Sequence, residues 1–142
     1  GERWKRLLSN IRNITEKFEQ PLDFNFIIFN DKIHLFSEDL VPATELNIMA
    51  VNNWLRSFQP DNGTDLTPAV VKALSMEETE VFVVLTDGLP SDGGNGAIQA
   101  FRDARRTRAK PFKVFTIGYQ QYDGEAFLKR MAEEFGGRYV RR

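Results

Sequence analysis

The sequence predicts a single α/β domain over residues 1–142, with a mostly parallel, Rossmann-like sheet covered by helices on both faces in three layers. Two observations predict this fold. Segments with the apolar spacing of amphipathic helices alternate with short runs of β-branched and aromatic residues. No linker, repeat or low-complexity segment interrupts them. Such alternation favours parallel strands joined by helical crossovers.

The chain opens with an amphipathic helix that ends before Pro21. Its apolar residues recur at helical spacing: Trp4, Leu7, Leu8, Ile11, Ile14 and Phe18. Two strand-like runs follow, FNFIIF (24–29) and IHLF (33–36). Asn30–Asp31 between them predicts the tight turn of an antiparallel hairpin.

The next helix lies within residues 42–58, with Thr44 as its N-cap. Its inner face carries Ile48, Val51, Leu55 and Phe58. The loop QPDNGTDLTP (59–68) is dense in turn-forming residues. A third helix begins after it, with Thr67 as the cap and Pro68 at the first helical position.

The second half of the chain repeats the strand–helix order. VFVVL (81–85) predicts a strand buried on both faces, and the helix after it ends before Pro111. FKVFTIGY (112–119) is the next strand. Asp123 caps the last helix, which Gly136–Gly137 end, and RYV follows as a short strand. The apolar residues of this last helix are Phe127, Leu128, Met131 and Phe135.

A carboxylate follows the apolar strand directly, at Asp87. A charge there needs water, a partner or a cation, and ligands of open α/β sheets bind beyond the carboxyl ends of the strands. Thr64 precedes a helix, which puts it at the same edge if that helix runs back along the sheet. One carboxylate and one hydroxyl form a partial site for a hard cation such as Mg²⁺. The other interpretation is an ordinary turn at each position, and the spacing alone leaves both open.

The composition argues against several classes of function. The 19 basic and 20 acidic residues give a net charge of −1, which argues against a general attraction to nucleic acid or anionic membranes. The basic segment 102–110 is typical of a solvated helix face with cations near its C-terminus. No apolar run approaches the roughly 18 residues of a membrane helix. The absence of cysteine excludes disulfides and thiolate metal sites, and it leaves the compartment undetermined.

Four motifs, in this order, resemble the von Willebrand factor type A domain. FNFIIFNDKIHLF (24–36) resembles the hairpin of that family, and NGTDLTPAV (62–70) its second metal loop. VVLTDGLPSDGG (83–94) resembles the third metal loop, and residues 115–140 the closing strand–helix–strand. The resemblance covers nearly the whole chain.

The resemblance implies a metal-ion-dependent adhesion site. In the family, three ligands come from an Asp-x-Ser-x-Ser loop, one Thr from the second loop and one Asp from the third. Thr64 and Asp87 match the last two positions, as ligands of Mg²⁺ (or Mn²⁺ or Ca²⁺). A carboxylate from a partner protein then completes the coordination of the cation. The resemblance therefore implies a protein-binding, adhesion-type module and not an enzyme. From the charge balance and the lack of a long apolar run, we expect neither nucleic-acid binding nor membrane insertion of this segment.

The first metal loop is missing from the sequence. No Asp-x-Ser-x-Ser occurs in it, and the chain begins at the helix that follows this loop in the family. We expect an N-terminal truncation that removes the central first strand and three of the five ligands. Cation binding by these residues alone is then weak or absent. Without that strand, the sheet must contain a gap, bring its remaining strands together or accept a strand from elsewhere. Because unpaired strand edges would be exposed, we expect the chain to be marginally stable.

Two alternatives remain open. One is a metal-free structural scaffold. The other is a Mg²⁺-dependent phosphoryl-transfer or receiver-like domain with Asp87 as nucleophile or ligand, which needs a paired acid and a positioned Lys or Arg. No second acid pair at a strand end and no phosphate-loop fingerprint supports the latter. Phosphorylation of Asp87 by a small phosphodonor would favour it.

Overall fold

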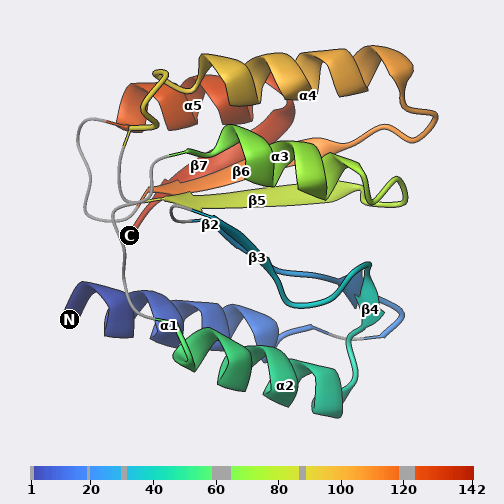
Figure 1. Ribbon diagram of the computed structural model, residues 1–142, viewed down its shortest axis with the longest axis vertical. Helices are drawn as coiled ribbons and strands as arrows, with labels where there is room; N and C mark the ends of the chain where they lie inside the picture. Colours follow the sequence, from blue (N-terminus) through green and yellow to red (C-terminus); the bar gives the residue numbers. More distant parts are fainter. Residues whose placement is uncertain (1, 19, 30–31, 59–64, 87–88, 119–123) are drawn as a thin grey trace.

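The computed structural model describes residues 2–18, 20–29, 32–58, 65–86, 89–118 and 124–142. Its layers run from α4 and α5, through the strands, to α1 and α2 on the opposite side (Figure 1). The helices are α1 (Glu2–Thr15), α2 (Glu45–Arg56), α3 (Thr67–Leu74), α4 (Asn95–Thr107) and α5 (Glu125–Glu134). The strands are β1 (Asp23–Phe24), β2 (Ile27–Phe29), β3 (Ile33–Leu35), β4 (Val41–Pro42), β5 (Val81–Thr86), β6 (Lys113–Gly118) and β7 (Gly136–Arg141). The predicted α/β fold with helices on both faces is confirmed.

The parallel part of the sheet has the order β5-β6-β7. Val81 of β5 pairs with Lys113 of β6, and the pairing continues to Thr86 and Gly118. The predicted hairpin is also present, because Ile27 of β2 pairs antiparallel with Leu35 of β3. Its predicted turn at Asn30–Asp31 lies outside the described residues.

The first of the predicted hairpin strands is split in two. Its start forms β1, and Phe24 there pairs with Val41 of β4 instead of continuing the hairpin. Asn25 lies at the break, where its Oδ1 accepts hydrogen bonds from the amides of Phe26 at 2.8 Å and Ser37 at 3.1 Å. An Asn side chain that bonds backbone in this way competes with the ladder of a continuous strand.

The sheet gaps between β2 and β5. In the described residues the hairpin β2–β3 and the sheet β5–β6–β7 are not hydrogen-bonded to each other. This gap is one of the three outcomes expected for a sheet without its central strand. The two parts still touch through side chains. Phe29 of β2 packs on the core under α3, α4 and α5, and Leu85 of β5 packs on the core between the hairpin and the helices α1 and α2.

The prediction that β5 is buried on both faces is wrong. Phe82 and Val84 are 7% and 8% exposed. The alternate residues Val81 and Val83 are 52% and 51% exposed. Successive side chains of a strand point to opposite faces, and among the described residues only one face of β5 is covered along its length. The sequence shows that these residues are apolar. Their burial depends on which elements cover the second face of β5, and the sequence pattern does not reveal this.

The upper core lies between the parallel sheet and the helices α3, α4 and α5. Its centre is Phe101 of α4, which is 1% exposed and whose ring makes tilted or edge contacts with those of Phe82, Phe112 and Phe135. The predicted inner face of the last helix is confirmed, because its four apolar residues are all buried.

The lower core joins the hairpin to α1 and α2. Val51 and Leu55 of α2 are 0% and 2% exposed, and they pack with Ile11 and Phe24. Thr15 of α1 is fully buried, and its Oγ1 accepts a hydrogen bond from Asn52 Nδ2 at 3.1 Å. This bond fixes the register of the two helices that cover the lower face.

The predicted helix ends have mixed outcomes. Thr44 is the N-cap of α2, because its Oγ1 accepts from the amide of Asn47 at 3.1 Å. Gly136 ends α5 with a φ of +76°, which favours glycine. The prediction that Thr67 caps α3 is wrong: Leu66 occupies the N-cap position, and Thr67 is the first helical residue. The predicted cap Asp123 lies outside the described residues.

Candidate metal site at the carboxyl edge of the sheet

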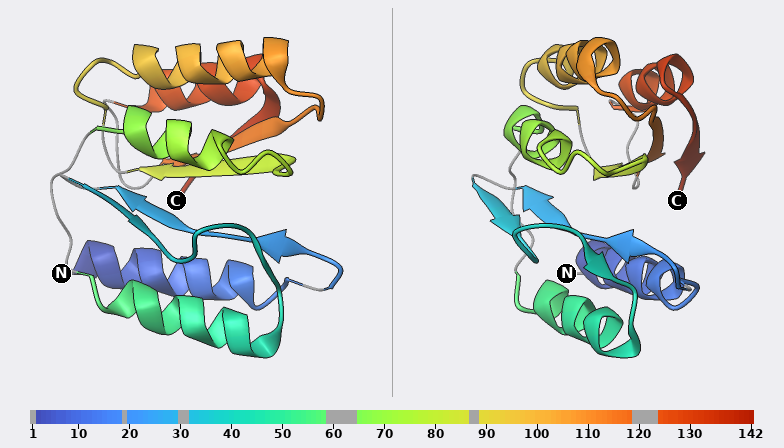
Figure 2. Two further views of the ribbon diagram at one scale, coloured as in Figure 1. Left: turned by 45° about the vertical axis from the view of Figure 1, so that its right-hand side comes forward. Right: turned by 90° about the vertical axis from the view of Figure 1, so that its right-hand side faces the viewer.

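One edge of the molecule collects the ends of the parallel strands. β5 ends there at Thr86 and β6 at Gly118, and the helices α3, α4 and α5 begin at the same edge (Figure 2, left). Parallel strands joined by helical crossovers impose this arrangement, because each strand runs toward the same edge and each helix runs back. It is the edge at which ligands of open α/β sheets bind.

The two predicted ligands, Thr64 and Asp87, lie outside the described residues. Their described neighbours are the segment Asp65–Leu66 that leads into α3, and Thr86 at the end of β5. Leu66 is 3% exposed and belongs to the upper core. The assignment of Thr64 and Asp87 as cation ligands stays a prediction.

A third polar residue of this edge is Asp92, in the segment that resembles the third metal loop, and the sequence alone left open whether it borders the site or is simply solvated. Its Oδ1 accepts a hydrogen bond from the amide of Gly94 at 2.8 Å, and its Oδ2 one from the amide of Gly96 at 3.0 Å. These amides belong to the start of α4, where backbone N–H groups have no partner within the helix. Asp92 lies two residues before Gly94, the N-cap of α4, and the signal in the sequence is an Asp in a Gly-rich turn, where its side chain bonds the backbone two residues on.

Asp92 also contacts the start of α3. The hydroxyl of Thr67 donates to Asp92 Oδ2 at 3.5 Å, the outer limit of a hydrogen bond. A methyl group added at Gly96 would lie 2.5 Å from Thr67 Oγ1 and 2.7 Å from Asp92 Oδ2. The absence of a side chain at Gly96 therefore allows the starts of α3 and α4 to touch.

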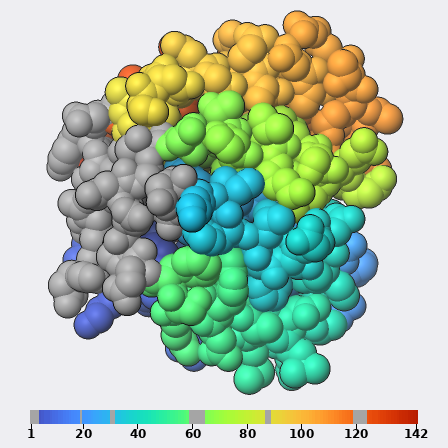
Figure 3. Space-filling view, viewed as in Figure 1, coloured from blue at the N-terminus to red at the C-terminus, as the bar shows by residue number. Residues whose placement is uncertain are grey.

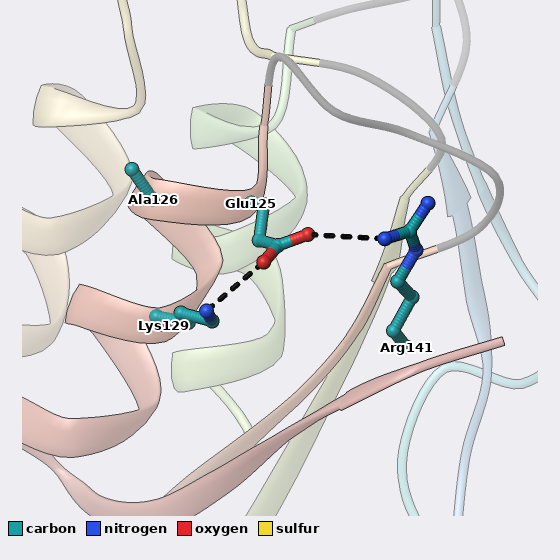
Figure 4. A pocket seen from close by; sticks show the side chains of 4 residues that line it. All are labelled: Glu125, Ala126, Lys129 and Arg141. Carbon is teal, nitrogen blue, oxygen red and sulfur yellow. Dashed lines mark ion pairs between the residues drawn. The ribbon is translucent and has the colours of Figure 1, made fainter.

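An ion-pair group lies at the start of α5. The carboxylate of Glu125 is 2.9 Å from Lys129 Nζ and 3.9 Å from Arg141 Nη1, and Figure 4 shows it between these two cations. The hydrogen bond from Lys129 lowers the pKa of Glu125. The group lines a shallow pocket of about 450 Å³. Because two cations already balance this carboxylate, it is a poor candidate for a metal ligand.

A second shallow pocket lies between β3 and α3, and it reaches the start of α3. It measures about 510 Å³, and its lining includes Ile33, Pro68 and Val71. Figure 3 shows the hairpin against α3 on this face. Carboxylates and histidine are not among its lining residues, so this pocket lacks the side chains that most often bind metal ions.

Metal-binding clusters are not found within the described ranges. Among those residues, no group of three or more His, Cys, Asp or Glu side chains could hold a metal ion. In the same residues, no helix is long and apolar enough to cross a membrane. His34, the single histidine, lies against the ring of Phe58 with 5.0 Å between ring centroids.

The basic segment 102–110 is engaged in ion pairs and carbonyl contacts. Arg102 bonds both carboxylate oxygens of Glu134, at 2.5 and 2.6 Å. Arg108 donates to the carbonyls of Thr79 and Met76 at 3.1 and 2.9 Å. Lys110 lies 2.7 Å from Glu78. These contacts agree with the interpretation of the segment as a solvated helix face. The side chains engaged in them do not form a row of cations that could bind phosphates.

Acid should weaken the domain through Glu134. The hydrogen bonds from Arg102 lower the pKa of Glu134 below its ordinary value. Because the folded-state pKa is lowered, this stabilisation is fully present above the unfolded-state pKa and is lost as pH falls through the folded-state pKa. We expect urea denaturation from pH 6 to pH 3 to show a smaller loss of stability for Glu134→Gln than for the wild type. Equal losses in both proteins would contradict this role.

The comparisons with known proteins decide the family. The family model of the von Willebrand factor type A domain matches residues 1–141 of the sequence. The chain belongs to this family. This von Willebrand factor type A (VWA) domain therefore has the fold that the four sequence motifs implied.

Relatives of this VWA domain are larger proteins. The inter-alpha-trypsin inhibitor heavy chain H1 of Homo sapiens is 24% identical over 135 residues, which cover 86% of this chain and 15% of the relative. The von Willebrand factor A domain-containing protein 3B of Homo sapiens is 26% identical over 129 residues, which cover 91% of this chain and 10% of the relative.

A solved structure shares the fold. A von Willebrand factor type A structure from Catenulispora acidiphila superposes with a TM-score of 0.73. The match covers 99% of this chain and 35% of that chain, at 13% sequence identity.

Proposed function

We propose that this VWA domain is a protein-binding module that recognises a carboxylate of its partner through a divalent cation at the carboxyl edge of the sheet. The supporting observation is the convergence at this edge. The end of β5, which leads into Asp87, and the start of α3, which follows Thr64, lie at one edge, and the Thr67–Asp92 contact ties the starts of α3 and α4 together. Two chain segments far apart in sequence thereby approach a common space.

The proposed ligands suit a hard cation. Mg²⁺ takes oxygen ligands, keeps several waters, and needs only one or two protein carboxylates. Asp87 would supply the charge and Thr64 a hydroxyl, while Asp92 and Glu125 are engaged by amides and by cations. One carboxylate and one hydroxyl hold Mg²⁺ weakly, so a strong site also needs the Asp-x-Ser-x-Ser loop, which does not occur in this sequence.

The proposal is one of recognition and not of catalysis. A bound cation with an open coordination position attracts a partner's carboxylate, and no bond is made or broken. Among the relatives, the heavy chain carries the words inter-alpha-trypsin inhibitor in its name. This is consistent with a domain that works by association.

The test is Mn²⁺ titration calorimetry on the natural chain that carries these residues. We expect Asp87→Ala to weaken cation binding at least about tenfold, because removing a charged ligand from a carboxylate-poor site costs about 1.4 kcal/mol or more. Asp65→Ala, an exposed acidic neighbour, is the matched control and should bind within about twofold of the wild type.

The outcome separates this proposal from the metal-free scaffold. Absence of a heat of binding in a chain that contains the Asp-x-Ser-x-Ser loop would favour the scaffold. So would equal binding by the wild type and Asp87→Ala.

A further inference from the structure

We propose that this domain binds a second copy of itself, with the exposed face of α2 of one copy seated in the groove between β3 and α3 of the other. The side chains that form this contact all lie in the described residues. The contact involves no cation and neither of the two proposed cation ligands. Its existence is therefore independent of the proposed function.

The groove presents an apolar face of α3 that the rest of the chain does not cover. Val71 is 55% exposed, and Ile33 of β3 forms the opposite wall at 36% exposure. The space between them measures about 510 Å³ (Figure 3). The residues of α3 that line it have the spacing i, i+3, i+4 and i+7 of a single helix face: Pro68, Val71, Lys72 and Ser75. This face has room for a further helix.

The exposed face of α2 carries side chains that match the groove. Leu46 is 78% exposed and Met49 is 62% exposed, the two highest values among the large apolar side chains of the described residues. The two residues are three positions apart and are therefore neighbours on the helix surface. Glu45, which is also exposed, precedes Met49 by four positions and lies on the same face. Single exposed apolar residues are ordinary, whereas an adjacent pair beside a carboxylate can form a contact surface.

The two surfaces carry opposite charges. Lys72 supplies the charge of the groove lining, which contains no carboxylate, and Glu45 supplies the charge beside Leu46 on α2. Among the residues that the structure describes, neither Glu45 nor Lys72 forms an ion pair. Complementary charges of this kind select a partner and fix its register. The groove therefore fits an apolar helix face that carries a carboxylate, and α2 of a second copy has such a face.

Helix geometry brings these groups into register when the two helices lie antiparallel. One alignment then pairs three residues of α2 with three of α3: Glu45 with Lys72, Leu46 with Val71, and Met49 with Pro68. In each helix the charged residue and the last apolar residue of the set are four positions apart, which is a rise of about 6 Å. The antiparallel arrangement also places the start of α2 beside the end of α3, where the helix dipoles attract each other.

The contact joins two different surfaces of the molecule. α2 lies in the layer opposite to α4 and α5, whereas α3 packs with α4 on the other side of the strands (Figure 1). Such a heterologous contact lets copies add head to tail. The net charge of −1 leaves little overall repulsion between copies. Because two helix faces and a shallow groove form a small interface, we expect a weak dissociation constant, on the order of 0.1–1 mM.

Sedimentation equilibrium of the 142-residue chain tests the contact. The average mass should rise above that of the monomer between roughly 10 µM and 1 mM protein. Leu46→Glu disables the face of α2 and Val71→Glu disables the groove, so each variant alone should stay monomeric. An equal mixture of the two should form a 1:1 dimer and nothing larger, because it contains one intact α2 face and one intact groove.

Charge reversal tests the pairing of Glu45 with Lys72. Glu45→Lys and Lys72→Glu should each weaken the association at least about threefold, because like charges then face each other. The variant with both changes should associate within about twofold of the wild type, because the pair is restored with its charges exchanged. Val83→Glu on β5 is the matched control, since Val83 is 51% exposed and lies outside the contact, and it should leave the association unchanged.

Four results would overturn the proposed contact. The first is a wild-type chain that stays monomeric up to 1 mM, and the second is association that persists in Leu46→Glu or Val71→Glu. The third is a failure of the double charge reversal to restore association. The fourth is a loss of association in Val83→Glu, which would assign it to the uncovered face of β5. Circular dichroism verifies that each variant is folded, and recovery of a dimer in the mixture shows the same for its two components.

Discussion

Replacing Gly137 by alanine is expected to destabilise the domain by about 3 kcal/mol. An added methyl group would lie 1.9 Å from the carbonyl oxygen of Val114 and 2.5 Å from its carbon. Both are backbone atoms of β6, which cannot move without disturbing β7. The two strands pair in parallel from Val114–Gly136 to Gly118–Arg141, with a shift of register between Val114 and Thr116 at this point.

Gly136→Ala is the matched control for this prediction. Gly136 has a φ of +76°, but the nearest atom to an added methyl group is Lys113 Cγ at 3.8 Å. Its substitution should cost about 1 kcal/mol, because the left-handed backbone disfavours alanine without any overlap. Urea denaturation compares the two variants. A loss at Gly137 no larger than that at Gly136 would show that β6 and β7 separate easily, contrary to this packing.

Phe101→Ala should cost about 3–5 kcal/mol. The ring is 1% exposed, and its centroid lies 5.4 Å from those of Phe82 and Phe135 and 5.9 Å from that of Phe112. Its removal leaves a cavity among rings that come from β5, from the residue before β6 and from the end of α5, so the site cannot collapse without moving several elements. Such a loss is a large share of the stability of a small domain.

Met49→Ala is the control, because its side chain is of comparable size and 62% exposed on α2. It should change the free energy of unfolding by less than about 0.5 kcal/mol. Urea midpoints of both variants give the comparison. Similar midpoints would mean that Phe101 is not at the centre of the upper core.

The fold could be predicted largely from local pattern. The spacing of apolar residues predicted all five helices of the described residues and the strands β5, β6 and β7. The burial of β5 could not be predicted, because apolar residues at Val81 and Val83 are consistent with a covered face, and only the neighbouring elements decide it. The β1–β4 pair was missed for a similar reason, since it depends on the side-chain bonds of Asn25.

The candidate site could be predicted in part. A charged residue at the end of an apolar strand identified Asp87, and the resemblance added Thr64 and the cation. The roles of Asp92 and Thr67 were missed, because a cap and a contact between two helix starts depend on how α3 and α4 pack. Thr67 was assigned to the cap of its own helix, whereas its hydroxyl faces a residue 25 positions away.

Paramagnetic broadening by Mn²⁺ in ¹⁵N-resolved NMR spectra of the 142-residue chain tests the central claim most directly, because it detects weak binding. If Thr64 and Asp87 share a cation, their amide signals and those of Asp65 and Thr86 should broaden first, and Asp87→Ala should remove the effect. Broadening centred on Glu125 or on the acidic residues Glu38, Asp39 and Glu45, or spread evenly over the surface, would contradict the account.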